Sequence, residues 1–334
     1  MSSRFPRAIA FVICLAAVCA GAWGRPRADL VVFQATVPVW PGQEWEIYTM
    51  DVSTGEVTNL TRRPGHGSAP SWSPNGEQIV FVQGQLAVMD WPSTEVQILA
   101  AQGRQPDYPT WSPDGKRIAY SAGVLPGFVN GKRDIFVVDL ETGVSEQLTS
   151  QPREDDHPTW SPDGRRIAFE SNRDPEFWQD TPAGVWKSAD IYVMDADGAN
   201  VVNLTKSDDY ESAAAWSPDG TEIAFVIATL DARYDLFVMN ADGTSRRRLT
   251  RFQTKCGYNP AWTPDGARIV FEVYDERADD GEILHVIDRN GDNLRPLPHH
   301  GHRDTEPSWY APPLGVQPAG KGVVVWGALK LAMR

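Results

Sequence analysis

Short stretches of alternating apolar and polar residues recur along most of the chain, without the three-to-four-residue spacing of an amphipathic helix. In one such stretch Ile167 and Phe169 flank Ala168, which predicts a half-buried β-strand. A second apolar stretch follows at residues 191–195 and has counterparts at residues 47–51, 86–90, 135–139, 236–240 and 284–288. A third ends in Leu-Thr, at residues 60–61, 148–149, 204–205 and 249–250. The pattern predicts an all-β fold of repeated short strands.

A Trp-Ser-Pro-Asp-Gly motif precedes the stretch at Ile167 and occupies residues 160–164. Proline sets the backbone for a tight turn, aspartate bonds nearby amides, and glycine takes the left-handed conformation that ends the turn. The tryptophan brings a large apolar area into the packing. The motif recurs about every 47 residues, a spacing typical of a four-stranded propeller blade. Its other copies begin at Trp72, Trp111, Trp216, Trp262 and, in a shortened form, Trp309.

The two ends of the repeated region complement each other. Residues 30–33 match the strand after the turn and not the tryptophan strand, whereas residues 306–309 supply a tryptophan strand with nothing after it. We therefore predict a six-bladed β-propeller of four-stranded antiparallel blades over residues 29–310. In this fold N-terminal strands pair with a C-terminal strand, which closes the ring and removes its open edges.

The segments outside the repeats predict export. Residues 1–24 have a basic start, an apolar stretch and an Ala-Gly-Ala cleavage site, as a signal peptide does. The apolar stretch is shorter than the roughly 20 residues that span a bilayer, so we expect no transmembrane segment after cleavage. The mature chain would keep only Cys256 and form no internal disulfide. The C-terminal tail, residues 311–334, could pack on the propeller or serve as a recognition tag.

Charge and length restrict the function further. The formal net charge is −13, which argues against a nucleic-acid partner. The repeats leave no block long enough for a second core, so we expect one folded domain. We also expect the protein to be a monomer.

The repeated motif, followed by Ile-Tyr-Val-Met-Asp-Ala-Asp-Gly at residues 191–198, resembles the TolB-like β-propeller repeat, a WD-repeat-like family. The resemblance extends over residues 30–309. It implies a periplasmic or extracellular, non-catalytic scaffold that binds a protein or peptide, and a carbohydrate ligand stays open. Similar propellers precede hydrolase domains in some peptidases, but no Gly-x-Ser-x-Gly nucleophile motif is present. A metal-dependent, polysaccharide-degrading enzyme of the oligogalacturonide lyase type is the alternative. We predict no catalytic residue, no cofactor and no metal ligand.

The repeats separate structural residues from candidate site residues. Aspartates present in every turn, such as Asp163, are expected to be structural. The short turns share one face, which we expect to be nearly uniform; the longer, irregular loops share the other face, where binding residues usually lie. The aromatic side chains on these longer loops, such as Trp178 and Trp186, could instead only cap blade edges. His299, His300 and His302 could bind a metal, but their spacing matches no standard ligand pattern, which favours a solvated loop. The predicted binding residues are Tyr108, Asp155, Asp156, His157, Phe177, Trp178, Trp186, Asp209, Tyr210 and Glu306.

Overall fold

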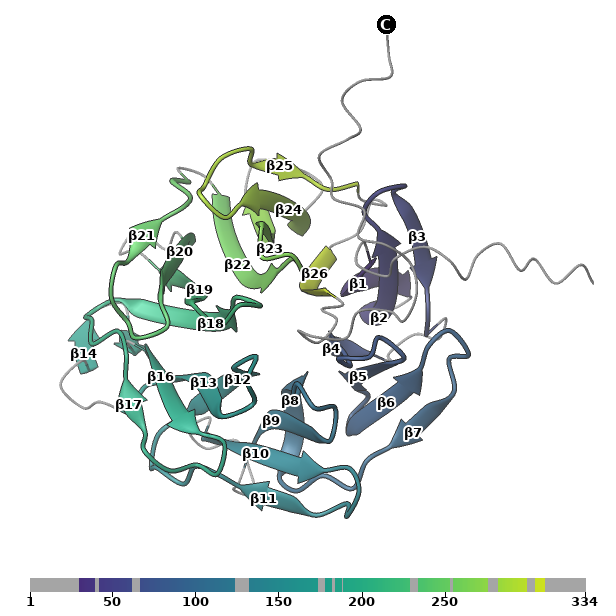
Figure 1. Ribbon diagram of the computed structural model, residues 1–334, viewed down its shortest axis with the longest axis horizontal. Coiled ribbons are helices and arrows are strands. Elements are labelled where there is room, and N and C mark those ends of the chain that lie inside the picture. The colour runs from purple at the N-terminus through teal and green to yellow at the C-terminus, as the bar shows by residue number, and fades with distance from the viewer. Residues whose placement is uncertain are drawn as a thin grey trace, which may run out of the picture.

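The computed structural model describes residues 30–39, 42–61, 67–123, 132–173, 178–181, 184–187, 189–228, 234–252, 255–275, 282–298 and 304–309. Within these ranges every regular element is a β-strand. Six four-stranded antiparallel sheets stand as blades around a central axis (Figure 1). The prediction of an all-β, six-bladed propeller is therefore confirmed.

The four strands of each blade are given below in order from the centre of the ring to its edge. Blade one has β4 (Ser68–Trp72), β5 (Gln78–Val82), β6 (Leu86–Asp90) and β7 (Val96–Ile98). Blade two has β8 (Arg104–Trp111), β9 (Arg117–Gly123), β10 (Arg133–Asp139) and β11 (Ser145–Gln147). Blade three has β12 (Asp155–Trp160), β13 (Arg166–Ser171), β16 (Asp190–Asp195) and β17 (Val202–Asn203). Blade four has β18 (Tyr210–Trp216), β19 (Glu222–Ala228), β20 (Tyr234–Asn240) and β21 (Arg247–Arg248). Blade five has β22 (Lys255–Trp262), β23 (Arg268–Asp275), β24 (Glu282–Asp288) and β25 (Arg295–Pro296).

Blade six joins the two ends of the chain. It contains β26 (Asp304–Trp309), β1 (Leu30–Val39), β2 (Gly42–Asp51) and β3 (Glu56–Asn59), in that order from the centre. Antiparallel pairing places Val31 opposite Trp309 and Ala35 opposite Asp304. The predicted closure by N-terminal and C-terminal strands is thus confirmed. β1 and β2 also stay paired as far as Val39 and Gly42, beyond the residues that the apolar pattern indicated.

The Trp-Ser-Pro-Asp-Gly segment forms the turn between the first two strands of a blade. In blade three, Asp163 Oδ1 accepts hydrogen bonds from Ser161 Oγ (2.6 Å) and from the Arg165 N–H (3.1 Å). Gly164 has a φ of +69°, in the left-handed region that favours glycine. Asp114, Asp219 and Asp265 make the same bonds in their own turns. The turn aspartates therefore have the structural role that their repetition predicts.

The recurring Leu-Thr pair attaches the short fourth strand to the third. The Leu148 N–H donates to the Ile135 carbonyl (2.8 Å), and Thr149 Oγ1 accepts from the Ile135 N–H (3.0 Å). Residues 60–61, 204–205 and 249–250 make the same two bonds to their third strands. The threonine side chain replaces a main-chain acceptor where the fourth strand ends.

The motif tryptophans fill the interfaces between blades. Trp160 is 5% exposed and lies in one cluster with Ile135 and Val137 of blade two and with Phe169 and Met194 of its own blade. The other five are 5–7% exposed. Each interface therefore buries one large aromatic side chain between neighbouring sheets.

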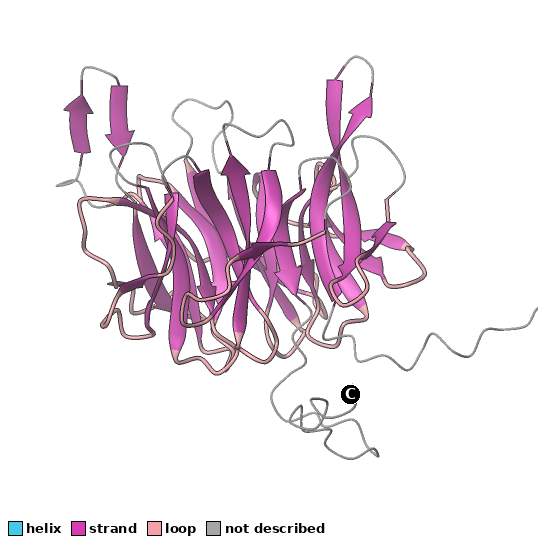
Figure 2. Cartoon of the chain, turned by 90° about the horizontal axis from the view of Figure 1, so that it is seen from above, coloured by secondary structure: helices cyan, strands magenta, loops and turns pink. Residues whose placement is uncertain are grey.

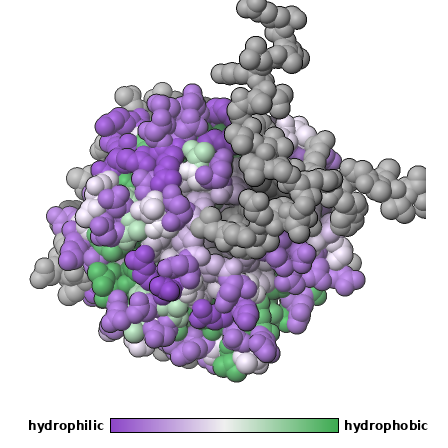
Figure 3. Space-filling model, viewed as in Figure 1, coloured by the Kyte–Doolittle hydropathy of each residue, from purple (hydrophilic) through white to green (hydrophobic). Residues whose placement is uncertain are grey.

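The two faces of the propeller differ in their connections. Figure 2 shows the short turns along the lower edge and two hairpins that project from the opposite, long-loop face. One is the far end of β1 and β2; the other consists of β14 (Trp178–Thr181) and β15 (Gly184–Lys187). Figure 3 shows the short-turn face, on which the described residues are mostly hydrophilic.

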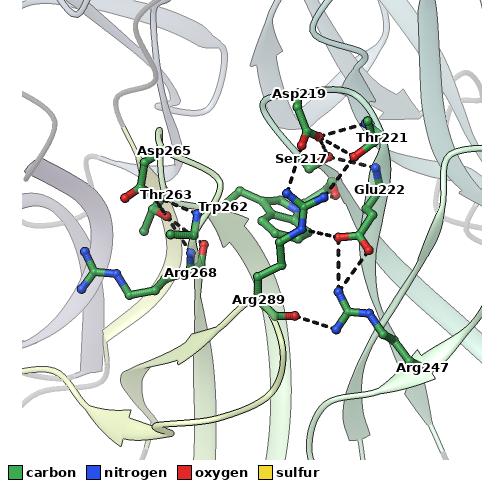
Figure 4. A network of polar contacts seen from close by, with 12 residues as sticks. Ser217, Asp219, Thr221, Glu222, Arg247, Trp262, Thr263, Asp265, Arg268 and Arg289 are labelled. Carbon is green, nitrogen blue, oxygen red and sulfur yellow. Dashed lines mark hydrogen bonds and ion pairs between the residues drawn. The ribbon is translucent and has the colours of Figure 1, made fainter. Parts of the chain in front are cut away.

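The short turns are alike in backbone but not in side chains. Arg289 of blade five reaches blade four, where its Nε lies 2.7 Å from Glu222 Oε2 and its Nη1 lies 3.0 Å from Asp219 Oδ2 (Figure 4). Arg247 binds the other Glu222 oxygen at 3.1 Å. The Arg289 guanidinium also lies 5.3 Å from the Trp262 ring centroid. This network joins two blades, so the expected uniformity of the face applies to its backbone only.

Candidate functional site

Each innermost strand contains a bulge just before its motif tryptophan. In β12, His157 and Pro158 lie opposite the single residue Phe169 of β13, because the register shifts between Asp156 and Thr159. His157 has a φ of +49°, which is uncommon for a residue other than glycine. A bulge of this kind turns a side chain to a new direction. The equivalent residues have φ between +47° and +52°: Ala69, Tyr108, Ala213, Asn259 and Glu306.

These six residues, Ala69, Tyr108, His157, Ala213, Asn259 and Glu306, are called the bulge ring below. Ala69 and Ala213 belong to blades one and four, which are opposite each other in the order of the blades. The larger polar side chains therefore form two pairs, one from blades two and three and one from blades five and six. The backbone repeats around the ring while the side chains do not.

A cavity of about 350 Å³ occupies the centre of the propeller, between the bulge ring and the short-turn face. The bulge ring lines one end, and prolines of the short turns, such as Pro113 and Pro162, line the other. Between them, each blade contributes one small residue to the wall, beside prolines and the motif tryptophans: Ser71, Thr110, Thr159, Ala215, Ala261 and Ser308. The wall thus repeats similar residues from blade to blade, whereas the bulge ring does not.

Five of the six bulge-ring N–H groups have side-chain acceptors, of two kinds. In three blades the acceptor belongs to the preceding blade: Gln34 accepts from Ala69 (2.8 Å), Glu170 from Ala213 (3.4 Å) and Glu272 from Glu306 (2.6 Å). In blades two and three the residue before the ring accepts instead. Asp107 Oδ1 is 3.1 Å from the Tyr108 nitrogen, and Asp156 Oδ1 is 3.0 Å from the His157 nitrogen. Four of the carboxylates near the ring therefore hold the bulges in place.

Two aromatic rings meet on one side of the bulge ring. The Tyr108 and His157 rings are stacked, with centroids 3.5 Å apart and 30° between their planes. His157 Nδ1 lies 3.3 Å from Glu170 Oε1. Burial disfavours the charged imidazole, but the neighbouring Glu170 carboxylate outweighs it and raises the pKa of His157 to about 9. His157 is therefore cationic at neutral pH and paired with Glu170.

Glu306 is the acidic member of the bulge ring. Its Oε2 atom is buried and has no hydrogen-bond partner among the described residues. Burial, followed by repulsion from Glu272 and Asp107, raises the pKa of Glu306 to about 8. The carboxyl group is consequently protonated for most of the time at neutral pH.

Asp156, His157 and Glu170 are the described residues whose donor atoms could jointly hold a metal ion, since these atoms lie within 4.8 Å of one another. Asp156 Oδ1, however, already accepts bonds from the Ser121 hydroxyl and the His157 N–H. Arg133 Nε lies 3.2 Å from the other Asp156 oxygen. Arg133 thus supplies the positive charge that a metal would bring, and the set fits an ion-pair cluster better than a metal site.

Four of the predicted binding residues lie together: Tyr108, Asp156, His157 and Glu306 are on the bulge ring or next to it. Asp155 does not join them, because it is fully buried and binds Arg173 through both oxygens at 2.9 Å. Asp209 is exposed, and Tyr210 is half-buried where the Glu170 carboxylate raises its pKa. Trp178 and Trp186 are in the β14–β15 hairpin. Phe177, His299, His300, His302, the signal segment and the C-terminal tail lie outside the described residues.

Asn259, Glu170 and Glu272 were missed as site residues. The signal for Asn259 is its place three residues before a motif tryptophan, the position that Tyr108, His157 and Glu306 share. Each of the two glutamates directly follows the aromatic residue of its second strand, Phe169 for Glu170 and Phe271 for Glu272. The other four blades have an uncharged residue there, so aligning the repeats by strand would have shown both.

Comparison with known proteins gives a family match for part of the chain. Residues 177–313 match the TolB beta propeller domain family. The Tol-Pal system protein TolB of Anaeromyxobacter dehalogenans is 32% identical over 126 residues, which cover 38% of this chain and 27% of that relative. The match thus spans well under half of the relative's length.

Two solved structures share the fold. TolB of Acinetobacter baumannii superposes with a TM-score of 0.68 at 20% identity, covering 85% of this chain and 67% of that one. An oligogalacturonate lyase in complex with manganese gives a TM-score of 0.53 at 17% identity, covering 80% and 73%. No helix long and apolar enough to cross a membrane occurs among the described residues.

Proposed function

Since this chain is a TolB-like β-propeller protein, we propose that it is an exported, non-catalytic scaffold that binds protein or peptide partners. The relative from Anaeromyxobacter dehalogenans is named as a component of the Tol-Pal system, which supports a role in protein interaction. The signal-like residues 1–24 support a periplasmic or extracellular location.

One observation carries the proposal: the bulge ring repeats one backbone position with different side chains around a central cavity. Two alanines, a tyrosine, a histidine, an asparagine and a glutamate occupy one backbone position in six equivalent strands. The ring lines the central cavity, although Tyr108 and His157 also stack on each other between blades two and three. Different side chains at one backbone position around a cavity are expected where a protein recognises a partner.

Affinity capture tests the proposal. The purified chain would be immobilised and exposed to an envelope extract from the exporting cell, in parallel with a Tyr108→Ala/Asn259→Ala variant. Tyr108 stacks on His157 and Asn259 donates to Glu272, so the melting temperature of the variant is measured first and capture is compared at a temperature where all the proteins are folded. Val202→Ala, at an exposed position of β17, is the matched control. We expect a saturable partner on the wild type and the control but not on the ring variant. Equal capture by all three would contradict recognition at the ring.

The β14–β15 hairpin is proposed as a second contact, on the long-loop face. It projects from that face (Figure 2) and carries Trp178 and Trp186. Aromatic residues are enriched at contacts that dominate binding energy. A contact at the hairpin in addition to one at the bulge ring suits a scaffold that brings partners together.

A metal-dependent polysaccharide-degrading enzyme is the alternative function, because an oligogalacturonate lyase shares the fold. The ion pair between Arg133 and Asp156 weighs against it, since it neutralises the cluster that could hold the metal. Metal analysis of protein purified without added ions separates the two functions. One equivalent of a transition metal that Glu170→Gln abolishes would favour the enzyme.

A further inference from the structure

We propose that the central cavity receives the N-terminal ammonium group of an extended partner segment, which enters from the short-turn face and ends against Glu306. The inference rests on the proposed scaffold function and names the chemistry of one partner.

The carboxylates around the bulge ring are of two kinds. Glu170, Glu272, Asp107 and Asp156 each accept a bulge N–H, so the fold itself accounts for them. The Glu306 carboxyl also interacts with a bulge N–H, that of Ala69, from which Gln34 already accepts a hydrogen bond. It lines the cavity, and its Oε2 is buried without a hydrogen-bond partner among the described residues. A buried carboxylate oxygen without a partner is costly, and a donor supplied by a ligand would remove that cost.

The charges around Glu306 favour a cationic ligand. The groups that act on it are Glu272 of blade five, Asp107 of blade two and His157 of blade three. Arg133 lies 3.2 Å from Asp156 and 3.9 Å from Asp107, and His157 is paired with Glu170, so neither cation forms an ion pair with Glu306. Negative charge at the end of the cavity is thus only partly balanced. A bound ammonium would stabilise the ionised form of Glu306. An ammonium group donates hydrogen bonds to its neighbours and accepts none.

The cavity wall suits a main chain more than a single long side chain. From His157 to Trp160 the strand rises about 10 Å, the length of about three extended residues. A lysine side chain that entered from outside the short-turn face is shorter than that path. The wall includes one small residue from each blade, and four of these, Ser71, Thr110, Thr159 and Ser308, carry hydroxyls that can donate to or accept from a main chain.

Direct binding of defined peptides to the full chain tests the inference. The probe is Ala-Gly-Ala-Gly-Tyr amide with a free N-terminus, compared by ligand-observed NMR with its N-acetylated form and with an N-acetylated form in which one glycine is replaced by lysine. We expect the free amine to bind at least about tenfold more tightly than the acetylated peptide. Glu306→Gln should remove that preference. Thr110→Phe should block binding, because the larger side chain fills part of the cavity without a change of charge. Asp209→Asn, an exposed aspartate outside the cavity, should leave binding unchanged.

The outcomes separate this inference from the scaffold function. Equal affinity for free and acetylated peptides, or an unchanged preference in Glu306→Gln, overturns the ammonium site. Tighter binding of the lysine peptide than of the free amine means that a side chain is the ligand and also overturns it. The scaffold function would survive these results if affinity capture still depended on Tyr108 and Asn259. Loss of all capture by the wild type would instead refute the scaffold, whatever the peptides do.

Discussion

Gln34 of β1 donates a hydrogen bond from its Nε2 to the Oγ1 of Thr305 in β26, over 3.0 Å, where the two ends of the chain meet. Its Oε1 accepts from the Ala69 N–H of blade one at 2.8 Å. One side chain thus joins the closing strand, its own strand and the next blade.

Removal of either half of this closure should prevent stable folding. Deletion of residues 30–33, or truncation before Glu306, leaves blade six incomplete and exposes a sheet edge to each side. We expect no cooperative thermal unfolding transition from either protein, measured by circular dichroism. Truncation after residue 312 is the control and should unfold as the full chain does. A near-native transition in the deletion would mean that closure is dispensable.

Replacement of a motif tryptophan should be strongly destabilising. Trp160→Ala removes a side chain buried between blades two and three, and we expect the free energy of unfolding to fall by about 3–5 kcal/mol. Val202→Ala, exposed on β17, should change it by less than about 0.5 kcal/mol. Urea denaturation measures both. A loss of under about 1 kcal/mol for Trp160→Ala would be inconsistent with its place between the blades.

Stability should depend on pH through Glu306. Its pKa of about 8 in the folded protein is above the value of about 4.3 for an unfolded glutamate, so between these values the folded state holds an extra proton. The contribution of Glu306 to the free energy of unfolding therefore falls as pH rises from about 4 to about 8. Glu306→Gln carries no titrating group and should melt above the wild type at pH 9, but not at pH 4.5. A difference in melting temperature that is the same at both pH values would argue against the raised pKa.

The hairpin on the long-loop face can be tested apart from the cavity. Trp178→Ala/Trp186→Ala should lower the capture of a partner from envelope extract while the melting temperature stays within about 2 °C of the wild type. Binding of the free-amine peptide should not change, because the hairpin is on the other face. A salt titration then distinguishes a basic peptide, whose binding weakens with ionic strength, from a neutral sugar. A large fall in melting temperature would give the hairpin a structural role instead.

The sequence predicts the blades well because each one repeats the same local chemistry. Asp163, Gly164 and the Leu-Thr pair at residues 148–149 act within one blade, so their roles follow from the motif alone. The closure also follows, because the strand that begins at Leu30 has no tryptophan strand before it.

The site is less predictable, because its contacts cross blades. Nothing near Glu170 in the sequence indicates that its carboxylate accepts the Ala213 N–H of the next blade. Asp155 and Asp156 are adjacent in sequence but differ in role, since alternate residues of a strand face opposite sides. Asp155 binds Arg173, whereas Asp156 caps the bulge at His157. The cavity could not be predicted either, since it depends on small wall residues from six blades at once.

The bulge that carries the ring residues has a consequence for how such a protein can diverge. Its left-handed backbone is fixed by acceptors on other residues, such as Gln34 and Glu272, and not by the ring side chain itself. Under the proposed function, a mutation at a ring position would therefore alter what the propeller recognises while the bulge at that position stays in place. Duplicated copies of such a gene could acquire new partners through six codons, without a compensating change in the core.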